Sequence, residues 1–527
     1  MQSRGDARAE EGFSPLAAPG VVALSVMLAT FMEVLDTTVV NVSLPHIAGD
    51  LSAGVDETTW VLTSYLVSNA IVLPATGWLS QAFGRKRFYM TCVGLFTVSS
   101  LLCGMAPSLM WLVLFRIIQG LGGGALQPIS QAILLESFPI RRRGMGMAIF
   151  GIGVVFAPVI GPTLGGWITD TYSWHWIFFI NLPVGILALI LTQMNVTDPP
   201  YLRRGVGRID YMGLGLLAVG IGCLQIVLDK GQREDWFQTQ WILQLAALSA
   251  VCLIALVFWE RRTKQPIIDL SIFGVRNYAP GVVLMFVLGA ALYGSLVLLP
   301  LFLQNLLGYT ATQSGIAISP GGIATLICMP VVGFLVGRKD VRVMVLFGLV
   351  MLAISMFMAS RYNLDISLWD AVYPRIVMGI GLAFLFVPLA TVIVSFMPRE
   401  KIGAATGVFN LMRNIGGSFG IAGVTTLLAR RSQFHQIRLI PHVSLYDPSY
   451  QHMSRESIGK LVAFGEPLWL AQKQAVGFAY AQVLRQATTM AFVDCFWLLG
   501  VAIIVIMPMV LLMRRPPRTA GPAPGTH

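Results

Sequence analysis

Two acidic residues lie inside the first long apolar run of the chain, which opens near Gly20. Glu33 and Asp36 stand three residues apart, so a helix presents both on one face. An acid such as Asp at the centre of a membrane-spanning helix costs about 2.5–3.5 kcal/mol, and it usually faces a protein-lined or wet cavity. The chemistry open to such a pair is the binding and release of protons or cations. The alternative is that each side chain reaches toward the nearest membrane surface.

A third charged residue, Arg116, lies inside another apolar run. An arginine within a span usually faces a cavity or a partner. A nearby guanidinium favours the ionised form of an acid, whereas burial away from water favours the neutral form. An acid that alternates between these environments releases its proton on one side and takes it up on the other. We expect Asp36 to be the main proton carrier, Glu33 to be a second carrier or a cation-sensing acid, and Arg116 to tune both.

The composition sets the class of protein. The chain has 527 residues, of which 56% are hydrophobic and 12% charged, and its mean hydropathy is +0.73. These values are typical of a polytopic membrane protein. The net charge of +11 therefore bears on membrane orientation, and we expect no nucleic-acid partner. The phosphate-binding pattern GxxxxGK[ST] is absent from the sequence, so we expect no ATP drive and no cofactor.

Fourteen apolar runs are long enough to span a membrane, which takes about 20 residues. They cover residues 20–42, 58–80, 88–105, 109–133, 144–168, 176–194, 211–228, 240–259, 279–303, 315–336, 343–360, 371–397, 402–428 and 490–513. Lys and Arg gather in the two tails and in the loops on their side. The short loops of the opposite side hold only Lys230, Arg233 and Arg361. The positive-inside rule then places both termini in the cytoplasm.

The sequence also repeats itself at an interval of 259 residues. Arg116 and the glycines after it recur at Arg375, and Gly144, Phe150 and Gly161 recur at Gly403, Phe409 and Gly420. The predicted fold is an all-α bundle of fourteen transmembrane helices, in which two six-helix units flank an inserted pair. The predicted parts are a tail (1–19), a first bundle (20–194), the inserted pair with its flanking segments (195–276), a second bundle (277–513) and a second tail (514–527). Parallel six-span repeats are typical of transporters that rock two halves around a midplane site.

Five motifs carry a resemblance to a known family. They are LDTTVVNVSLP (35–45), GWLSQAFGRKR (77–87), RIIQG (116–120), APVIGPTLGG (157–166) and WHWIFFINLP (174–183). The chain resembles the major facilitator superfamily and, within it, the fourteen-span drug–proton antiporters of the EmrB/QacA type. One departure is Gln81, which stands where the family's loop motif usually has an acid.

The resemblance implies export of amphipathic toxic compounds across the bacterial inner membrane, driven by the proton-motive force. It also implies a periplasmic adaptor protein (membrane fusion protein) and an outer-membrane channel as partners. Export of one dedicated metabolite or siderophore is the alternative. An intramembrane enzyme or receptor is disfavoured, because the six-span repeat argues against it and no cluster of His, Asp or metal ligands lies at one membrane depth. We therefore expect a transporter that is not an enzyme.

Glycines, prolines and basic residues suggest the moving parts. Gly77 and Gly84 permit a tight turn and close helix approach. Arg85 and Lys86 then lie at the cytoplasmic face, where they either fix the orientation or bond helix ends of the opposite half.

In the fifth run, Pro158 and Pro162 bend the helix, and Gly161, Gly165 and Gly166 allow close packing. Such a helix either restricts leak between the halves or is a purely structural kink. For Arg375 and Arg413 we expect contacts in helix packing or gating.

The substrate cavity is expected between the halves. Its candidate lining residues are polar or adaptable side chains on the first, fourth and neighbouring spans: Met32, Asn41, Tyr65, Asn69, Gln119 and Asn410.

A long polar loop, 430–489, is predicted on the periplasmic side. A segment within it, 466–485, has a helical pattern. The loop either docks the adaptor or forms a passive cap over the outer mouth of the cavity.

Overall fold

The computed structural model describes residues 18–139, 142–198, 210–263, 266–395, 397–444 and 446–513. The predicted tails lie outside the described residues, apart from residues 18 and 19, and so do basic residues such as Arg141 and Arg203 on which the orientation prediction partly depends. Every regular element in the described ranges is a helix. The predicted all-α class is therefore confirmed.

The first half of the chain forms a bundle in which short connections join long apolar helices. Its helices are α2 (Pro19–Asp50), α3 (Val55–Thr58), α4 (Trp60–Phe83), α5 (Arg85–Gly104), α6 (Leu109–Gly123), α7 (Leu126–Ser137), α8 (Arg143–Thr171), α9 (Trp176–Phe179) and α10 (Asn181–Asn195). Gly84 has a φ of +83°, which glycine adopts without strain, so α4 turns directly into α5 at this residue.

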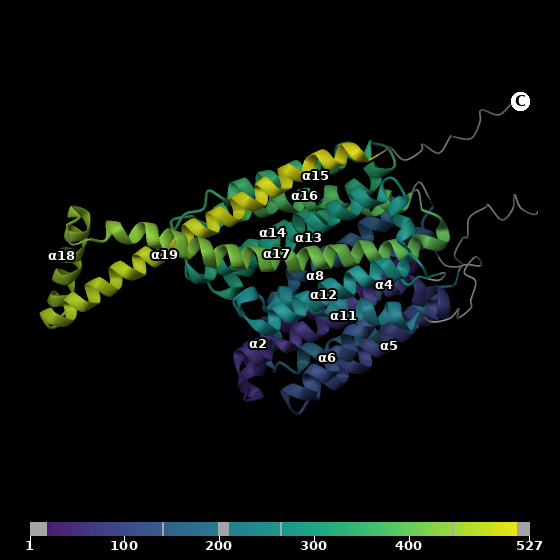
Figure 1. The fold of residues 1–527 in the computed structure, drawn as a ribbon, viewed down its shortest axis with the longest axis horizontal. Coiled ribbons are helices and arrows are strands. Elements are labelled where there is room, and N and C mark those ends of the chain that lie inside the picture. Colours follow the sequence, from purple (N-terminus) through teal and green to yellow (C-terminus); the bar gives the residue numbers. More distant parts are fainter. Residues whose placement is uncertain are drawn as a thin grey trace, which may run out of the picture.

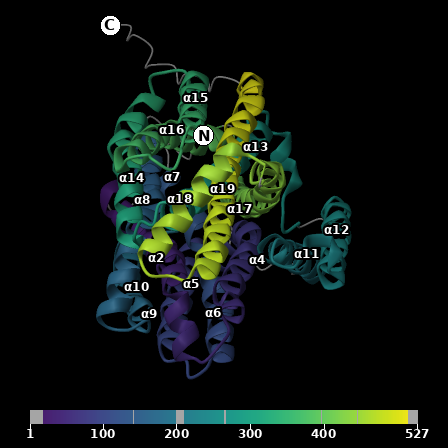
Figure 2. The ribbon, with the colours of Figure 1, turned by 90° about the vertical axis from the view of Figure 1, so that its left-hand side faces the viewer.

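The second half repeats this plan after a separate helix pair. The pair is α11 (Tyr211–Lys230) and α12 (Gln240–Glu260), with the short helices η2 (Trp236–Gln238) and η3 (Leu270–Gly274). The second bundle contains α13 (Tyr278–Asn305), α14 (Ala311–Val336), α15 (Val341–Ala359), α16 (Leu368–Ser395), η4 (Arg399–Lys401), α17 (Ile402–Leu439), η5 (Ile440–His442), α18 (Pro448–Ala463), α19 (Leu468–Ile506) and η6 (Met507–Leu512). Figure 2 shows α11 and α12 beside the main bundle.

Each of the fourteen predicted runs falls on a helix, but the number of spans is smaller by length and composition. Eleven helices among the described residues are long and apolar enough to cross a membrane, or twelve if the bent pair Arg143–Pro158 and Ile160–Thr171 counts as one span. Helices α4 and α17 fall outside this set, because polar residues interrupt their apolar sequence. The described residues therefore contain a bundle of eleven or twelve candidate spans, and the predicted count of fourteen is not confirmed.

The predicted loop 430–489 is largely helical in its described part. Helix α17 continues to Leu439, α19 begins at Leu468, and α18 lies between them at the tip of an arm that extends from the bundle (Figure 1). The helical pattern predicted within 466–485 is confirmed, because α19 covers residues 468–485. The connection contains more helix than this pattern predicted, because α17 also continues to Leu439 and α18 lies between the two. Arg431 and His435 of α17 both bond the Asp494 carboxylate of α19, at 2.5 and 2.7 Å, and join the base of the arm.

The two halves touch most closely near the Gly84 turn. A Cβ atom placed on Gly77 of α4 would lie 2.5 Å from the Cα atom of Ala404 in α17. A Cβ atom on Gly144 of α8 would lie 2.6 Å from the carbonyl oxygen of Gly333 in α14. Glycine therefore allows the two backbones to meet at both places, as was predicted for Gly77.

Helix α8 also packs closely on α2, next to the acidic pair. Cβ atoms on Gly161 and Gly165 would lie 1.9 Å from the Thr38 hydroxyl oxygen and 2.9 Å from a Val39 methyl group. Gly166 is less confined, because its Cβ would meet only Val42, at 3.9 Å. The two halves of α8 meet at an angle of 42° near Pro158, in agreement with the loss of a backbone donor at each proline.

Arg85 forms an ion pair with Glu136 of α7, and Lys86 donates from Nζ to the Gln193 carbonyl at 2.6 Å. Both of these partners lie in the first half. Gln81 reaches the second half, because its Nε2 donates to the Glu400 carbonyl at 2.8 Å. The alternatives stated for Arg85 and Lys86, fixing the orientation or bonding the opposite half, stay predictions.

We predict opposite effects for alanine at two helical glycines. A Cβ on Gly120 of α6 would lie 2.0 Å from the Ser68 hydroxyl and 2.5 Å from the Tyr65 carbonyl, whereas a Cβ on Gly94 of α5 meets nothing within 4 Å. Crowding of this kind typically costs about 1–3 kcal/mol, while alanine gains up to about 1 kcal/mol over glycine in a helix. Gly120→Ala should therefore lower the midpoint of thermal unfolding, and Gly94→Ala should leave it unchanged or raise it. Equal midpoints for the two variants would contradict the packing described for α6.

Candidate functional site

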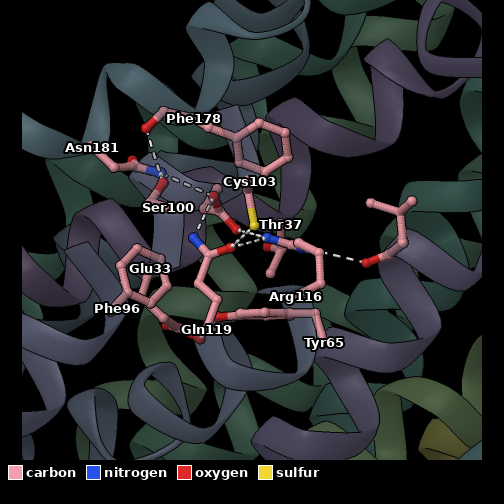
Figure 3. A network of polar contacts seen from close by, with 12 residues as sticks. Glu33, Thr37, Tyr65, Phe96, Ser100, Cys103, Arg116, Gln119, Phe178 and Asn181 are labelled. Atoms are coloured by element: carbon pink, nitrogen blue, oxygen red, sulfur yellow. Dashed lines mark hydrogen bonds and ion pairs between the residues drawn. The ribbon is translucent and has the colours of Figure 1, made fainter. Parts of the chain in front are cut away.

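Arg116, Gln119 and Asn181 belong to a polar network in the first half (Figure 3). All three donate to the Asp36 carboxylate. Arg116 of α6 donates from Nη1 to Asp36 Oδ2 at 2.5 Å, and the Asp36 side chain is almost fully buried. The other oxygen, Oδ1, accepts from the side-chain amides of Asn181 at 2.9 Å and Gln119 at 3.2 Å. Asp36 therefore has a cation and two amide donors around it, and these contacts fit an ionised carboxylate.

Arg116 is held in this position from several sides. Its Nε donates to the Val61 carbonyl at 3.1 Å, and its Nη1 donates to Gln119 Oε1 at 2.9 Å. The guanidinium carbon lies 4.2 Å from the centroid of the Tyr65 ring, which is a cation–π contact. Close approach of α6 to α4 at Gly120 brings the arginine against this ring. The sequence prediction that Arg116 acts on the acids of α2 thus has a direct geometric basis at Asp36.

Glu33 occupies a second network one helical turn earlier on α2. Its Oε1 accepts from the Tyr65 hydroxyl at 3.2 Å and from Asn69 Nδ2 at 3.1 Å, and its Oε2 accepts from Gln127 Nε2 at 2.6 Å. All three donors are neutral groups, and the Glu33 side chain is buried. Tyr65 joins the two networks, because its hydroxyl meets Glu33 while its ring covers Arg116.

The Glu33 network continues into the second half of the protein. Arg413 of α17 donates from Nη2 to Gln127 Oε1, so Gln127 bridges a buried acid of one half and a buried arginine of the other. One turn further along α7, Asn410 Nδ2 donates to Gln131 Oε1 at 2.7 Å. These bonds place polar groups from both halves at one interface between α7 and α17.

The predicted lining residues take four kinds of position. Tyr65, Asn69 and Gln119 belong to the two acid networks, and Asn410 belongs to the interface between the halves. Met32 packs in the hydrophobic core, whereas Asn41 is exposed on α2.

Sequence reasoning missed the amide groups that complete the networks. Asn181 stands in the motif 174–183, and Gln127 and Gln131 follow the Arg116 motif by about three turns of helix. An amide inside an apolar run is the signal that could have found them, since a buried amide needs a partner.

A cavity lies in the second half and at its border with α8. It offers about 30 Å³ of space to a water-sized sphere, and α8, α13, α14 and α16 all contribute to its wall. Arg375 is the only charged side chain among the described residues that line it. None of the residues of the Asp36 and Glu33 networks lines this cavity.

The chain matches a known protein family over most of its length. The Major Facilitator Superfamily family model matches residues 26–421. The chain is 37% identical to multidrug export protein EmrB of Haemophilus influenzae, over 94% of this chain and 96% of the relative. It is 36% identical to fatty acid resistance protein FarB of Neisseria gonorrhoeae, over 95% and 97%. Among solved structures, the human organic anion transporter MFSD10 (TETRAN) has a TM-score of 0.58 at 13% identity, covering 93% of this chain and all of that one. This last likeness shows a shared fold.

We predict that Asp36→Asn destabilises the protein. The substitution leaves Arg116 buried without its counter-charge, and breaking a buried pair in this way costs about 3–5 kcal/mol. Arg116→Gln should have a similar effect. The double variant should lose less than the two single variants together, because it removes both charges.

Thermal unfolding of the purified protein in one detergent measures this prediction. Glu33→Gln is the matched control, since its direct partners are neutral and its loss should be smaller. Strictly additive effects of Asp36→Asn and Arg116→Gln would show that the two side chains do not interact energetically.

Proposed function

This chain belongs to the Major Facilitator Superfamily, as an EmrB-type membrane transporter and not an enzyme, and from that membership we propose that it exports amphipathic toxic compounds across the bacterial inner membrane in exchange for protons. The names of its relatives support this substrate range, since one is a multidrug export protein and another a fatty acid resistance protein. Transport by alternating access follows from the two-bundle architecture.

The main support for proton coupling is a pair of hydrogen bonds in series, in which Gln127 bonds both Glu33 and Arg413. Glu33 is a buried carboxylate bonded by neutral donors, and the residue at the far end of the series lies in the other half. A buried acid without a cation in contact can exist in both protonation states at modest cost. We therefore assign proton uptake in this conformation to Glu33. Asp36, which is paired with Arg116, orders the site and carries a proton once that pair opens.

Proton binding at Glu33 acts on the interface through the Gln127 amide. A proton on Oε2 makes this oxygen a hydroxyl donor and a weaker acceptor for the Gln127 N–H. The arrangement then favoured is one in which the Gln127 amide turns its oxygen toward this hydroxyl, and that oxygen is the atom that Arg413 bonds. Protonation thus weakens a bond between α7 and α17 and favours separation of the halves there. Deprotonation restores the bond.

Orientation completes the cycle. We propose that both termini and the Gly84 turn face the cytoplasm and that α18 faces the periplasm. The close contacts at Gly77 and Gly144 then belong to a state that is closed toward the cytoplasm. The substrate cavity and Glu33 would open to the periplasm from this state, so substrate leaves there as a proton enters.

We predict that Glu33→Gln abolishes transport driven by a pH gradient but keeps exchange of substrate across a membrane without a gradient. The glutamine amide imitates the protonated acid and cannot release a proton. The measurement is quenching of a fluorescent lipophilic dye in proteoliposomes, with and without an imposed gradient. Asp170→Asn is the matched control, because Asp170 is an exposed acid on α8 and should leave both activities at the wild-type level. Gradient-driven transport at wild-type rate by Glu33→Gln would assign the proton to another residue.

The arm formed by α17, α18 and α19 is proposed as the docking surface of a periplasmic adaptor protein that leads to an outer-membrane channel. Large aromatic side chains are exposed at its tip: Tyr446 is 93% exposed, Phe464 88% and Trp469 61%. Exposed aromatic groups of this kind are typical anchors in protein interfaces. The arm reaches away from the bundle, as a contact with a second protein requires (Figure 1).

We predict that replacing residues 440–479 by a short Gly/Ser linker separates transport from resistance. The shortened protein should still transport in proteoliposomes, because the bundle and the base of the arm at Asp494 are kept. It should lose co-purification with the adaptor and the protection of intact cells. A triple variant with Tyr446, Phe464 and Trp469 changed to Ser tests the same surface without shortening the arm. Unchanged co-purification and unchanged resistance in both variants would leave the arm as a passive cap.

A further inference from the structure

The two halves carry the same buried arginine with different partners. Arg116 donates from Nη1 to the Asp36 carboxylate at 2.5 Å, and Arg375 donates from Nη1 to the Ser295 hydroxyl at 3.3 Å. Both Arg375 and Ser295 lie 259 residues after their counterparts in the first half. The second half therefore keeps the guanidinium, and a hydroxyl group replaces the acid that neutralises it.

The second partner of the arginine has changed in the same way. Arg116 also bonds Gln119 Oε1 at 2.9 Å, whereas Arg375 contacts Met378 Sδ at 3.1 Å. Met378 again lies 259 residues after Gln119. A thioether sulfur is only a weak acceptor. Across the described residues, Arg375 forms no ion pair with a carboxylate.

Among the described residues, no aromatic ring is in cation–π contact with Arg375, whereas the Tyr65 ring covers Arg116. In the first half α6 meets α4 where a Cβ on Gly120 would lie 2.5 Å from the Tyr65 carbonyl. In the second half a Cβ on Gly379 would lie 2.0 Å from the Gly321 carbonyl, so Gly321 occupies the place of Tyr65. Glycine has no side chain, and the space that the ring fills in the first half is part of a cavity in the second.

That cavity has the composition of a site for an amphipathic molecule. Its wall is apolar apart from Arg375 and Thr325, and Thr325 already donates to the Gly379 carbonyl at 3.0 Å. Leu292, which lies 259 residues after Glu33, stands in the wall. Its other lining residues are Val155, Pro158, Leu296, Ile318, Gly322 and Leu382.

A buried guanidinium without a counter-charge is unfavourable, and the free energy is regained when a carboxylate binds it. We propose that Arg375 binds the carboxylate head group of an amphipathic organic acid, whose hydrocarbon chain lies against the apolar wall of the cavity. The ligand's carboxylate takes the position that Asp36 has in the first half. This inference rests on the proposed export function and names the class of substrate for it.

Binding of radiolabelled dodecanoate to the purified protein in an uncharged detergent tests the proposal. Arg375→Gln removes the cation, and Ser295→Asp supplies the carboxylate that Asp36 supplies to Arg116. Each should weaken dodecanoate binding by about tenfold or more, as expected for loss of a charge-assisted bond. Dodecanol, which lacks the charge, should compete poorly with dodecanoate for the wild-type protein. Arg361→Gln is the matched control, because Arg361 is an exposed arginine after α15, and it should bind as the wild type does.

Two further readouts keep the test decisive. Ser295→Asp should raise the midpoint of thermal unfolding without ligand, since it gives Arg375 a partner, and this separates lost binding from misfolding. Equal dodecanoate affinity in wild type, Arg375→Gln and Ser295→Asp would overturn the proposal. Gradient-driven export of a cationic dye is measured separately on the wild type. If the wild type exports the dye but the two variants bind dodecanoate as tightly as the wild type, this site is rejected and the transport function is kept. Absence of any gradient-driven export, with dodecanoate bound through Arg375, would reject the function and keep the site.

Discussion

A charge buried among apolar helices needs a counter-charge, and the Asp36–Arg116 pair meets this need in the first half. Three helices converge on it: α2 supplies the acid, α6 the arginine and α10 the amide of Asn181. Close packing of α6 on α4 adds the Tyr65 ring, and close packing of α8 on α2 follows within a turn of Asp36. The glycine motifs therefore also matter for electrostatics, because they bring the helices close enough for the buried charges to reach their partners.

The sequence predicts the helices and the burial of both acids well, because apolar runs and charges within them have one stable arrangement in a membrane. It also predicts the close approach at Gly77, Gly161 and Gly165, which the structure confirms. It does not predict that Glu33 and Asp36 enter different networks. Residues three apart share a helix face but differ by about one turn along the axis and about 60° around it, so the partners depend on which neighbouring side chains lie at each level.

Other differences arise from tertiary contacts that local sequence does not contain. The arm reads as a polar loop because its helices are exposed, and their pairing at Asp494 involves residues about sixty positions apart. The correspondence of Ser295 with Asp36 was present in the sequence at the same interval as the arginines. It carries no signal until the structure shows that Ser295 touches Arg375, since a serine in an apolar run is ordinary.

Packing alone does not account for an arginine at position 375, because an apolar side chain of similar size avoids the cost of a buried charge. Around Arg375, Ser295, Met378 and Gly321 take the places of Asp36, Gln119 and Tyr65 around Arg116. With the proton at Glu33 and the ligand carboxylate at Arg375, the proton site and the substrate site lie in different halves. Protons and substrate cannot compete for one group in such an arrangement. The proton acts on the substrate site through the interface, and the Gln127–Arg413 bond, which ends at the buried acid Glu33, is the contact suited to transmit that effect.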